Sequence, residues 1–362
     1  MNKVFINKVY RILKRKIDAF VGSLYPLEKT LELMIARPYV LHLEFTNLCN
    51  AKCTFCPYQF QERKIEFMSD KVFYKTVMDF CEMGGGSADI TPIVGEALID
   101  PDFLKRIRYL RSQEKIDRIH LTTNGILLDK VGIEKILNSG LTSITISTAG
   151  FEEEMYERVY RSASYIRMKD NVLNLLQINS KRSEPLHITI ALRTDRSLND
   201  ILKDKDFQPI LAFKPNIDFT WSYTTAGGRI TRDKLSPSMK LRALGLHKKP
   251  CVQLFDGPIV LPDGTVMACS CVAAMDAVND LGIGNILESN LLDIWTNNKM
   301  KEIRASFGTN SLNKTCAKCD MYREPEIFKT YEGREMAKIN KQRLEGKIVY
   351  RKDKPREPFP LG

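Results

Sequence analysis

The chain has 362 residues, 43% of them hydrophobic and 27% charged, with a formal net charge of +11 at pH 7. This length provides for one large domain and a smaller one, whose cores need no disulfide bonds. The composition excludes a disordered chain, and no apolar run approaches the roughly 18 residues of a membrane span. Because no secretion signal is visible at the N-terminus, we expect a cytoplasmic protein.

The first regular pattern is a basic amphipathic helix within residues 1–38. Apolar side chains recur at helical spacing, at Ile6, Val9, Leu13, Ile17 and Phe20. The pattern favours packing on the domain that follows, and the alternative is peripheral contact with an anionic membrane through residues 4–20. A second basic segment, the tail 326–362, ends the chain.

Strands and helices alternate from residue 39 to about residue 235. We expect strands at 39–45, 88–95, 116–125, 141–148, 186–194 and 216–223. Helices are expected between them at 69–83, 100–112, 129–140 and about 152–179. This rhythm predicts a parallel α/β architecture, in which loops at the carboxyl ends of the strands carry the chemistry.

After about residue 235 the alternation stops. Residues 251–320 are rich in turns and cysteines, with a strand–turn–strand pattern in "GPIVLPDGTVMACSC" and a helix expected at 291–305. We therefore divide the chain into a barrel domain, 39–235, and a smaller module, 236–325.

Three of the nine cysteines follow the first expected strand directly. Cys49, Cys53 and Cys56 form a C-x3-C-x2-C pattern. Clustered cysteines in a protein without disulfides indicate metal ligation. Three thiolates on a [4Fe–4S] cluster would leave one iron open to another ligand. A zinc site with a distant fourth ligand is the alternative.

With Phe55 before the last cysteine, this segment resembles the radical S-adenosylmethionine (SAM) enzymes, whose hallmark is C-x3-C-x-aromatic-C after the first strand. The resemblance spans residues 39–325 and implies a partial (β/α)6 barrel with a C-terminal iron–sulfur module. It further implies a SAM-binding [4Fe–4S] cluster, SAM itself, and a flavodoxin- or ferredoxin-type electron donor. Reductive cleavage of SAM would give a 5′-deoxyadenosyl radical that abstracts hydrogen from the substrate.

The resemblance also suggests residues that contact SAM. In "IVGEALID" Gly95 and Glu96 match the family's Gly-Gly-Glu motif, while Val94 replaces the first glycine. A carboxylate suits the ammonium group of SAM. The remaining candidates lie near later strand ends and are Thr122, Asn124, Ser147, Arg161 and Arg193, with Arg158 as an alternative to Arg161.

The C-terminal cysteines resemble the SPASM/twitch extension of these enzymes. By spacing, Cys251, Cys269, Cys316 and Cys319 would hold one auxiliary [4Fe–4S] cluster. Cys271 departs from the minimal pattern, so it either replaces Cys269 or lies near the substrate as a free thiol. A zinc knuckle is the alternative.

The resemblance implies either a small polar substrate or a ribosomal peptide. Because residues 1–38 are too short for a peptide-recognition domain, we expect a sugar or aminocyclitol, including nucleotide- or lipid-linked forms. Oxidation would need an acceptor for a proton and an electron. Epimerisation would need a hydrogen donor, for which Cys271 is the catalytic candidate, whereas Cys81 is expected to be structural. The alternatives are a radical SAM maturase of ribosomal peptides and a non-catalytic iron–sulfur electron carrier. We expect no nucleic-acid partner, because no dense basic–aromatic stripe is present.

Overall fold

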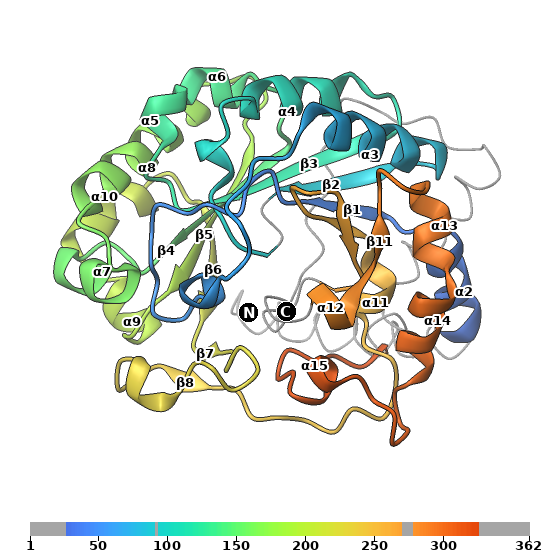
Figure 1. Ribbon diagram of the computed structural model, residues 1–362. Helices are drawn as coiled ribbons and strands as arrows, with labels where there is room; N and C mark the ends of the chain where they lie inside the picture. The colour runs from blue at the N-terminus through green and yellow to red at the C-terminus, as the bar shows by residue number, and fades with distance from the viewer. Residues whose placement is uncertain (1–26, 91–92, 270–277, 326–362) are drawn as a thin grey trace, which may run out of the picture.

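The computed structural model describes residues 27–90, 93–269 and 278–325. Six parallel strands, β1 to β6, lie side by side in chain order and curve into a partial barrel (Figure 1). Helices cover the convex face of this sheet, while the concave face forms the lumen. This is the partial (β/α)6 barrel that the sequence predicts.

The strands of the described segments fall into a nine-stranded sheet and a short pair. The sheet runs in the order β11-β10-β9-β1-β2-β3-β4-β5-β6, and the pair is β7-β8. Their bounds are β1 Val40–Leu43, β2 Gly86–Ile90, β3 Ile116–Thr123, β4 Ser143–Thr148, β5 His187–Arg193, β6 Asn216–Thr220, β7 Ser222–Tyr223, β8 Lys240–Leu241, β9 Ile259–Val260, β10 Thr265–Met267 and β11 Gly282–Asn285.

Most helices connect successive strands of the barrel. Those up to β6 are α2 Leu27–Ala36, α3 Asp70–Glu82, α4 Phe103–Ser112, α5 Leu128–Val131, α6 Ile133–Leu137, α7 Glu153–Tyr160, α8 Tyr165–Ser180, α9 Leu198–Ile201 and α10 Gln208–Leu211. The C-terminal ones are α11 Gln253–Asp256, α12 Val278–Leu281, α13 Leu291–Thr296, α14 Asn298–Ala305 and α15 Lys314–Ala317. Among the helices described, none is long and apolar enough to cross a membrane.

Three helices that the pattern predicts as continuous are interrupted, each by an identifiable residue. Gly132, with φ of 97°, separates α5 from α6. Arg161 adopts a left-handed conformation that ends α7 four residues before α8 begins. Asn297 caps α14 through its side chain and thereby ends α13. The last expected strand also divides, into β6 and β7, while the expected helix 4–20 lies outside the described residues.

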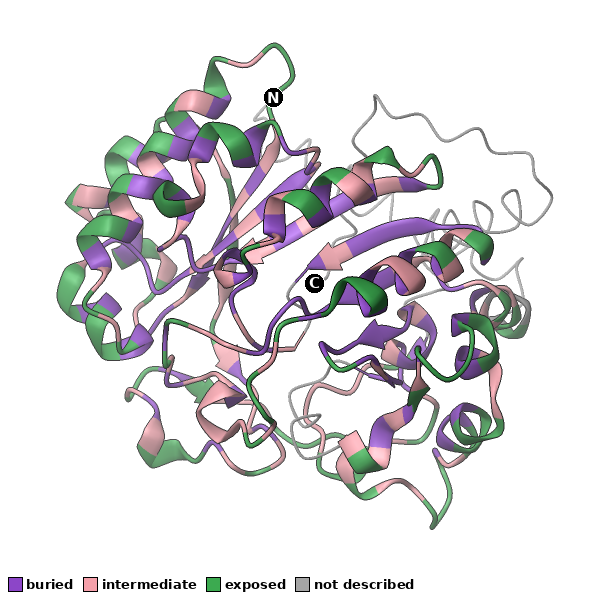
Figure 2. Ribbon diagram, turned by 45° about the horizontal axis from the view of Figure 1, so that its top comes forward, coloured by how far each residue is buried: buried purple, intermediate pink, exposed green. Residues whose placement is uncertain are grey.

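Alternation along the strands separates an apolar convex face from a polar lumen. Side chains such as Leu41, Leu43 and Ile119 are fully buried beneath the helices, where Figure 2 shows the buried surface concentrated. The intervening residues line the lumen in register. One row crosses five strands at the same level and comprises His42, Asp89, His120, Ser143 and His187. A second row, one pleat nearer the carboxyl ends, holds Thr122, Thr145 and Thr189.

The C-terminal module extends the barrel sheet. Strand β9 pairs in parallel with β1, and β10 and β11 follow as antiparallel strands. Gly257 permits this approach, since a Cβ there would lie 1.7 Å from the carbonyl oxygen of Val40. The module is therefore joined to the barrel through backbone hydrogen bonds as well as side chains.

Candidate active site

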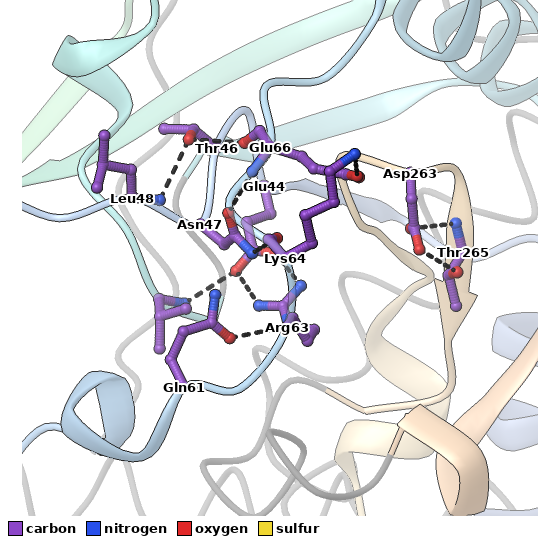
Figure 3. Close-up of polar contacts among 11 residues, drawn as sticks. Glu44, Thr46, Asn47, Leu48, Gln61, Arg63, Lys64, Glu66, Asp263 and Thr265 are labelled. Atoms are coloured by element: carbon purple, nitrogen blue, oxygen red, sulfur yellow. Dashed lines mark hydrogen bonds and ion pairs between the residues drawn. The ribbon is translucent and has the colours of Figure 1, made fainter.

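The first three cysteines lie on the long loop between β1 and α3, at the carboxyl edge of the sheet. Hydrogen bonds close the base of this loop (Figure 3). Thr46 donates its hydroxyl to the carbonyl of Glu66 at 2.8 Å, and Asn47 donates to the carbonyl of Lys64 at 2.8 Å. Asn47 also accepts from the amide of Glu66 at 2.9 Å. Both ends of the loop are thus held together without any cofactor.

A buried ion pair lies beneath the loop. Glu44 has no exposed surface, and its two carboxylate oxygens accept from the guanidinium of Arg63 at 2.7 and 3.0 Å. Glu44 also accepts from the backbone amide of Val94 at 3.2 Å. Burial raises the pKa of Glu44, and the hydrogen bond and charge of Arg63 oppose that rise. The pair joins the end of β1, the cysteine loop and the loop after β2.

Glu96 lies at the centre of the carboxyl edge. Its backbone amide donates to Leu48, while its carboxylate accepts from Leu98, Thr123 and Asn124 at 3.2, 2.8 and 2.8 Å. Because a carboxylate has about four acceptor positions, one remains for a ligand. The preceding Gly95 must be glycine, since its φ is 97° and a Cβ would lie 2.1 Å from the Thr46 carbonyl.

Neighbouring elements hold the top of the cysteine loop. The amides of Lys52 and Thr54 donate to the Tyr160 and Val159 carbonyls at the end of α7. The side chain of Asn124 donates to Asn50, between the first two cysteines, at 2.7 Å. The other atom of the Asn124 amide accepts from Ile126. Asn124 thus supports the loop, a role distinct from the direct SAM contact that its motif suggests.

The three thiols lie within electrostatic range of one another. Burial raises the pKa of Cys49 to about 12, with a further contribution from Glu96, and raises the pKa of Cys56 to about 11. The pKa of Cys53 is raised by burial and by the two other thiols. Such thiols ionise on binding a metal, which removes this penalty. The amide of Tyr58 donates to the Cys56 sulfur at 3.5 Å.

A group of aromatic rings packs around Phe55 of the cysteine loop. The ring of Phe55 lies 5.7 Å from that of Tyr160 and 5.4 Å from that of Tyr223. Tyr160 stacks on Tyr156 at 5.1 Å, and its hydroxyl hydrogen-bonds to Ser147 at 2.8 Å. Sequence reasoning selects Phe55 and Ser147 but misses both tyrosines of α7, which present no motif of their own.

The remaining SAM candidates lie in different surroundings. Thr122 lies in the lumen, with its hydroxyl 3.4 Å from His120. Arg193 contacts Asp218 at 2.9 Å and Thr220 at 2.5 Å, so the guanidinium is already paired along the lumen wall. Arg161 is exposed at the end of α7, beside the segment that binds the cysteine loop. Its neighbour Arg158 is paired with Asp195 at 2.9 Å.

The second cysteine set is assembled from three segments. Cys251 precedes α11, Cys269 follows β10, and Cys316 and Cys319 lie in and after α15. Cys316 experiences the charges of the three other members of the set, and Cys251 experiences those of Cys269 and Cys319. Burial and this repulsion raise the pKa of Cys251 to about 12. The structure therefore brings together the four cysteines that spacing selects.

The arrangement of the thiols bears on which kind of metal centre each cysteine set could hold. Within the described ranges, no three His, Cys, Asp or Glu side chains converge closely enough for that. An iron–sulfur cluster does not require such convergence, because each thiolate binds a different iron. The donor sets thus fit clusters, with three thiols in one site and four in the other.

Cys81 and Cys271 belong to neither cysteine set. Cys81 lies on α3, on the convex side of the sheet, near Lys115 and Tyr109. Burial raises its pKa to about 11, so it is a protonated thiol remote from the lumen. Cys271, the catalytic candidate, lies outside the described residues.

Two carboxylates of the C-terminal module bind the barrel. Asp256 accepts from Nε2 of His42 at 3.2 Å, while Nδ1 of the same ring lies 3.8 Å from Asp89. Burial alone would lower the pKa of His42, but the hydrogen bond and charge of Asp256, with Asp89, outweigh it and raise that pKa. Asp320, next to Cys319, accepts from Thr224 and Thr225.

A partial (β/α)6 barrel with three cysteines after its first strand, joined to a four-cysteine module, defines the iron–sulfur enzymes that cleave SAM. Family comparison agrees with this class. The model of the Radical SAM superfamily matches residues 43–207, and that of the SPASM iron–sulfur cluster-binding domain matches residues 251–320. The chain therefore carries a radical SAM domain followed by a C-terminal SPASM domain. Its cofactors are SAM, the SAM-binding [4Fe–4S] cluster and auxiliary iron–sulfur clusters in the SPASM domain.

Similar proteins extend this picture. A GTP 3′,8-cyclase of Pasteurella multocida is 25% identical over 224 residues, which are 59% of this chain and 66% of that protein. The chain spans about half to two thirds of the curated relatives it matches. Streptococcus suis SuiB bound to its precursor peptide SuiA has a TM-score of 0.57 at 15% identity, covering 82% of this chain and 74% of SuiB. The AdoMet-bound protein anSMEcpe has a TM-score of 0.51 at 16% identity, covering 84% and 100%.

Proposed function

We propose that this enzyme oxidises a hydroxyl-bearing carbon of a small polar substrate bound in the barrel lumen. The observation that carries the proposal is the polar lumen itself. Imidazole, carboxylate and hydroxyl side chains form in-register rows across five strands, and a ligand rich in hydroxyl groups can both donate to them and accept from them. Sugars and aminocyclitols have the complementary groups. We also propose the division into barrel 39–235 and module 236–325.

Several residues are proposed to hold the cofactors. Cys49, Cys53 and Cys56 would bind three irons of the SAM cluster, and Glu96 would offer its remaining acceptor position to the SAM ammonium. Cys251, Cys269, Cys316 and Cys319 would bind the auxiliary cluster. When bound, SAM and the reduced cluster supply a 5′-deoxyadenosyl radical, which removes a hydrogen atom from the substrate.

Oxidation of the alcohol then requires loss of a proton and one electron, and His42 is the proposed proton acceptor. Asp256 accepts from Nε2–H, which leaves Nδ1 of the ring without a proton and directed toward Asp89. A histidine whose tautomer is fixed by a carboxylate is a competent general base. An auxiliary cluster held by Cys251, Cys269, Cys316 and Cys319 would accept the electron. Cys81 lies on α3, outside the lumen, so it could not give a hydrogen atom to a substrate radical there, as epimerisation would require.

The test begins with anaerobic reconstitution, for which we expect about eight irons per chain. The dithionite-reduced protein should form 5′-deoxyadenosine from SAM. It should then be incubated with ring-deuterated sugars, aminocyclitols, nucleotide sugars and GTP. Deuterium transfer into 5′-deoxyadenosine with a carbonyl product supports oxidation. An inverted alcohol, or an intramolecular ring closure, would contradict it.

His42→Gln tests the proton acceptor in the same assay. Removal of the base should lower the yield of oxidised product about 100-fold, while 5′-deoxyadenosine still forms. His120→Gln, in the same row but without a carboxylate partner within hydrogen-bond distance, is the matched control. Equal losses in both variants would assign His42 to substrate binding alone.

A further inference from the structure

The segment between β8 and α11 has an unusual surface. From Lys234 to Phe255 the sequence contains no acidic residue but carries Lys234, Lys240, Arg242, Lys248 and Lys249. Within it, residues 243–246, Ala-Leu-Gly-Leu, are all exposed. The side chains of Leu244 and Leu246 are 59% and 74% exposed. Single exposed leucines are ordinary, but four consecutive exposed apolar residues indicate a contact surface.

This run lies against the segment that carries the second cysteine set. His247, directly after Leu246, contacts the carbonyl of Cys319 through Nε2 at 2.8 Å. Its ring also packs on Tyr322 at 4.5 Å. Arg242 reaches the sulfur of Met321 at 2.6 Å. The exposed apolar residues are thus connected to a proposed cluster ligand by one residue and one hydrogen bond.

A second exposed apolar group borders the same surface. The side chain of Trp221 is 61% exposed, and the ammonium of Lys240 lies 5.6 Å from its ring centre. The backbone of Lys240 bonds to Trp221, because β7 and β8 pair here. We define the docking surface as Trp221, Leu244 and Leu246 with Lys240 and Lys248, because Lys240 contacts Trp221 and the other three residues follow within eight positions of the same segment.

We propose that this docking surface binds a small acidic one-electron carrier protein, which exchanges electrons with the auxiliary cluster. The inference rests on the proposed oxidation, since the electron taken from the substrate must leave the cluster before the next turnover. One electron would pass from the reduced auxiliary cluster to the oxidised carrier, which returns the cluster to its oxidised state and leaves the carrier reduced. A small apolar centre bordered by charges of one sign is typical of transient electron-transfer contacts.

An anionic membrane is the other surface that basic and apolar residues could bind. The position of the run favours a redox protein, because the contact adjoins the segment that bears Cys319. A carrier bound there would approach the cluster through His247 and the Cys319 backbone. Lipid binding would gain nothing from that proximity.

The experiment uses the full chain with Cys49→Ala, Cys53→Ala and Cys56→Ala, so that only the auxiliary cluster accepts electrons. A reduced plant-type [2Fe–2S] ferredoxin is the probe, and stopped-flow absorbance follows its oxidation. We expect Leu244→Ser/Leu246→Ser and Lys240→Glu/Lys248→Glu each to lower the bimolecular rate constant about tenfold or more. Direct binding of the ferredoxin, measured as Kd, should weaken in parallel.

Three controls make the result decisive. Reduction by dithionite should not change, which shows that the cluster is intact. Leu287→Ser/Leu292→Ser and Lys135→Glu/Lys203→Glu change exposed residues elsewhere and should leave ferredoxin rates unaltered. Unchanged rates in the docking-surface variants, or losses confined to binding of anionic phosphatidylglycerol vesicles, would overturn the proposal. The measurement needs neither SAM nor substrate, so failure of the proposed oxidation is a separate outcome.

Discussion

The two cysteine sets are built in opposite ways. Cys49, Cys53 and Cys56 lie within eight consecutive positions of one loop. The ends of this loop are joined by hydrogen bonds and by the Glu44–Arg63 pair. The second set comes from three segments that span residues 251 to 319. Contacts within one loop shape the first site, whereas the second depends on contacts between distant segments, such as the hydrogen bond from the Val252 amide to the Arg323 carbonyl, to which iron would add. We expect metal binding to matter for catalysis in the first and for folding in the second.

The largest effect should follow from Cys53→Ala. Loss of one of three proposed ligands should remove the SAM-binding cluster and lower 5′-deoxyadenosine formation more than about 1,000-fold. Because the base of the loop is closed by side chains, the Tm of the metal-free protein should hardly change. Calorimetry with and without iron measures this, and a large fall in the Tm of the apo protein would break the comparison.

Cys316→Ala should have the converse profile. Iron content should fall from about eight to about four, and the Tm of the reconstituted protein should fall with it. Formation of 5′-deoxyadenosine should continue, since the barrel site is unaltered, while oxidised product is lost. Retention of all the iron would show that the auxiliary cluster does not depend on Cys316.

Arg63→Met tests what closes the first site. The variant leaves the Glu44 carboxylate buried without its partner, which should reduce the free energy of unfolding by about 3–5 kcal/mol. Glu44→Gln/Arg63→Met should recover much of that loss, because no unpaired charge remains. Urea denaturation of all three proteins measures the effect. Equal free energies of unfolding for the single and double variants would show that the unpaired Glu44 charge does not cause the loss of stability.

Gly257→Ala tests the attachment of the second region. The added Cβ would overlap the Val40 carbonyl, so β9 must move away from β1 at a cost of about 1–3 kcal/mol. Gly245→Ala, where a Cβ would meet nothing within 4 Å, is the matched control. A loss of iron from the module alone would show that its cysteines depend on docking to the barrel.

The smallest effect concerns pH. Because Asp256 and Asp89 together raise the folded pKa of His42, protonated His42 stabilises the fold below the unfolded pKa of about 6.5. This contribution is lost as pH rises through the folded value. The Tm should therefore decrease modestly between about pH 5.5 and about pH 8, and Asp256→Asn should reduce that decrease. An identical pH profile in the variant would disprove the contribution.

Local patterns in the sequence predict much of this molecule. The strand–helix rhythm gives the barrel, and cysteine spacing gives both sets. The strand–helix rhythm and the cysteine spacing do not predict which distant residues contact one another. Asn50 and Asn124 are 74 residues apart, and His42 and Asp256 are 214 apart. No local preference distinguishes these polar residues from surface ones, so their pairing emerges only when the sheet forms.

The same limit applies to the roles of the motif residues. Glu96 and Asn124 are visible in the sequence as candidate SAM contacts, yet the Glu96 carboxylate accepts from Thr123 and Asn124, and the Asn124 side chain donates to Asn50 of the cysteine loop. Gly132 is a visible helix breaker, whereas the left-handed Arg161 is not, because nothing in its residue type requires that conformation. Sequence therefore identifies the neighbourhood of the site better than the function of each side chain.

The pairing of β9 with β1 has a consequence for synthesis of the protein. During translation the barrel strands emerge first, and β1 has no partner on its outer side until residues 259–260 follow. An unpaired strand edge is a template for association with other chains. The nascent barrel is therefore vulnerable to aggregation until the β9–β10 hairpin of the same chain has left the ribosome. Expression of residues 39–235 alone would leave that edge permanently exposed.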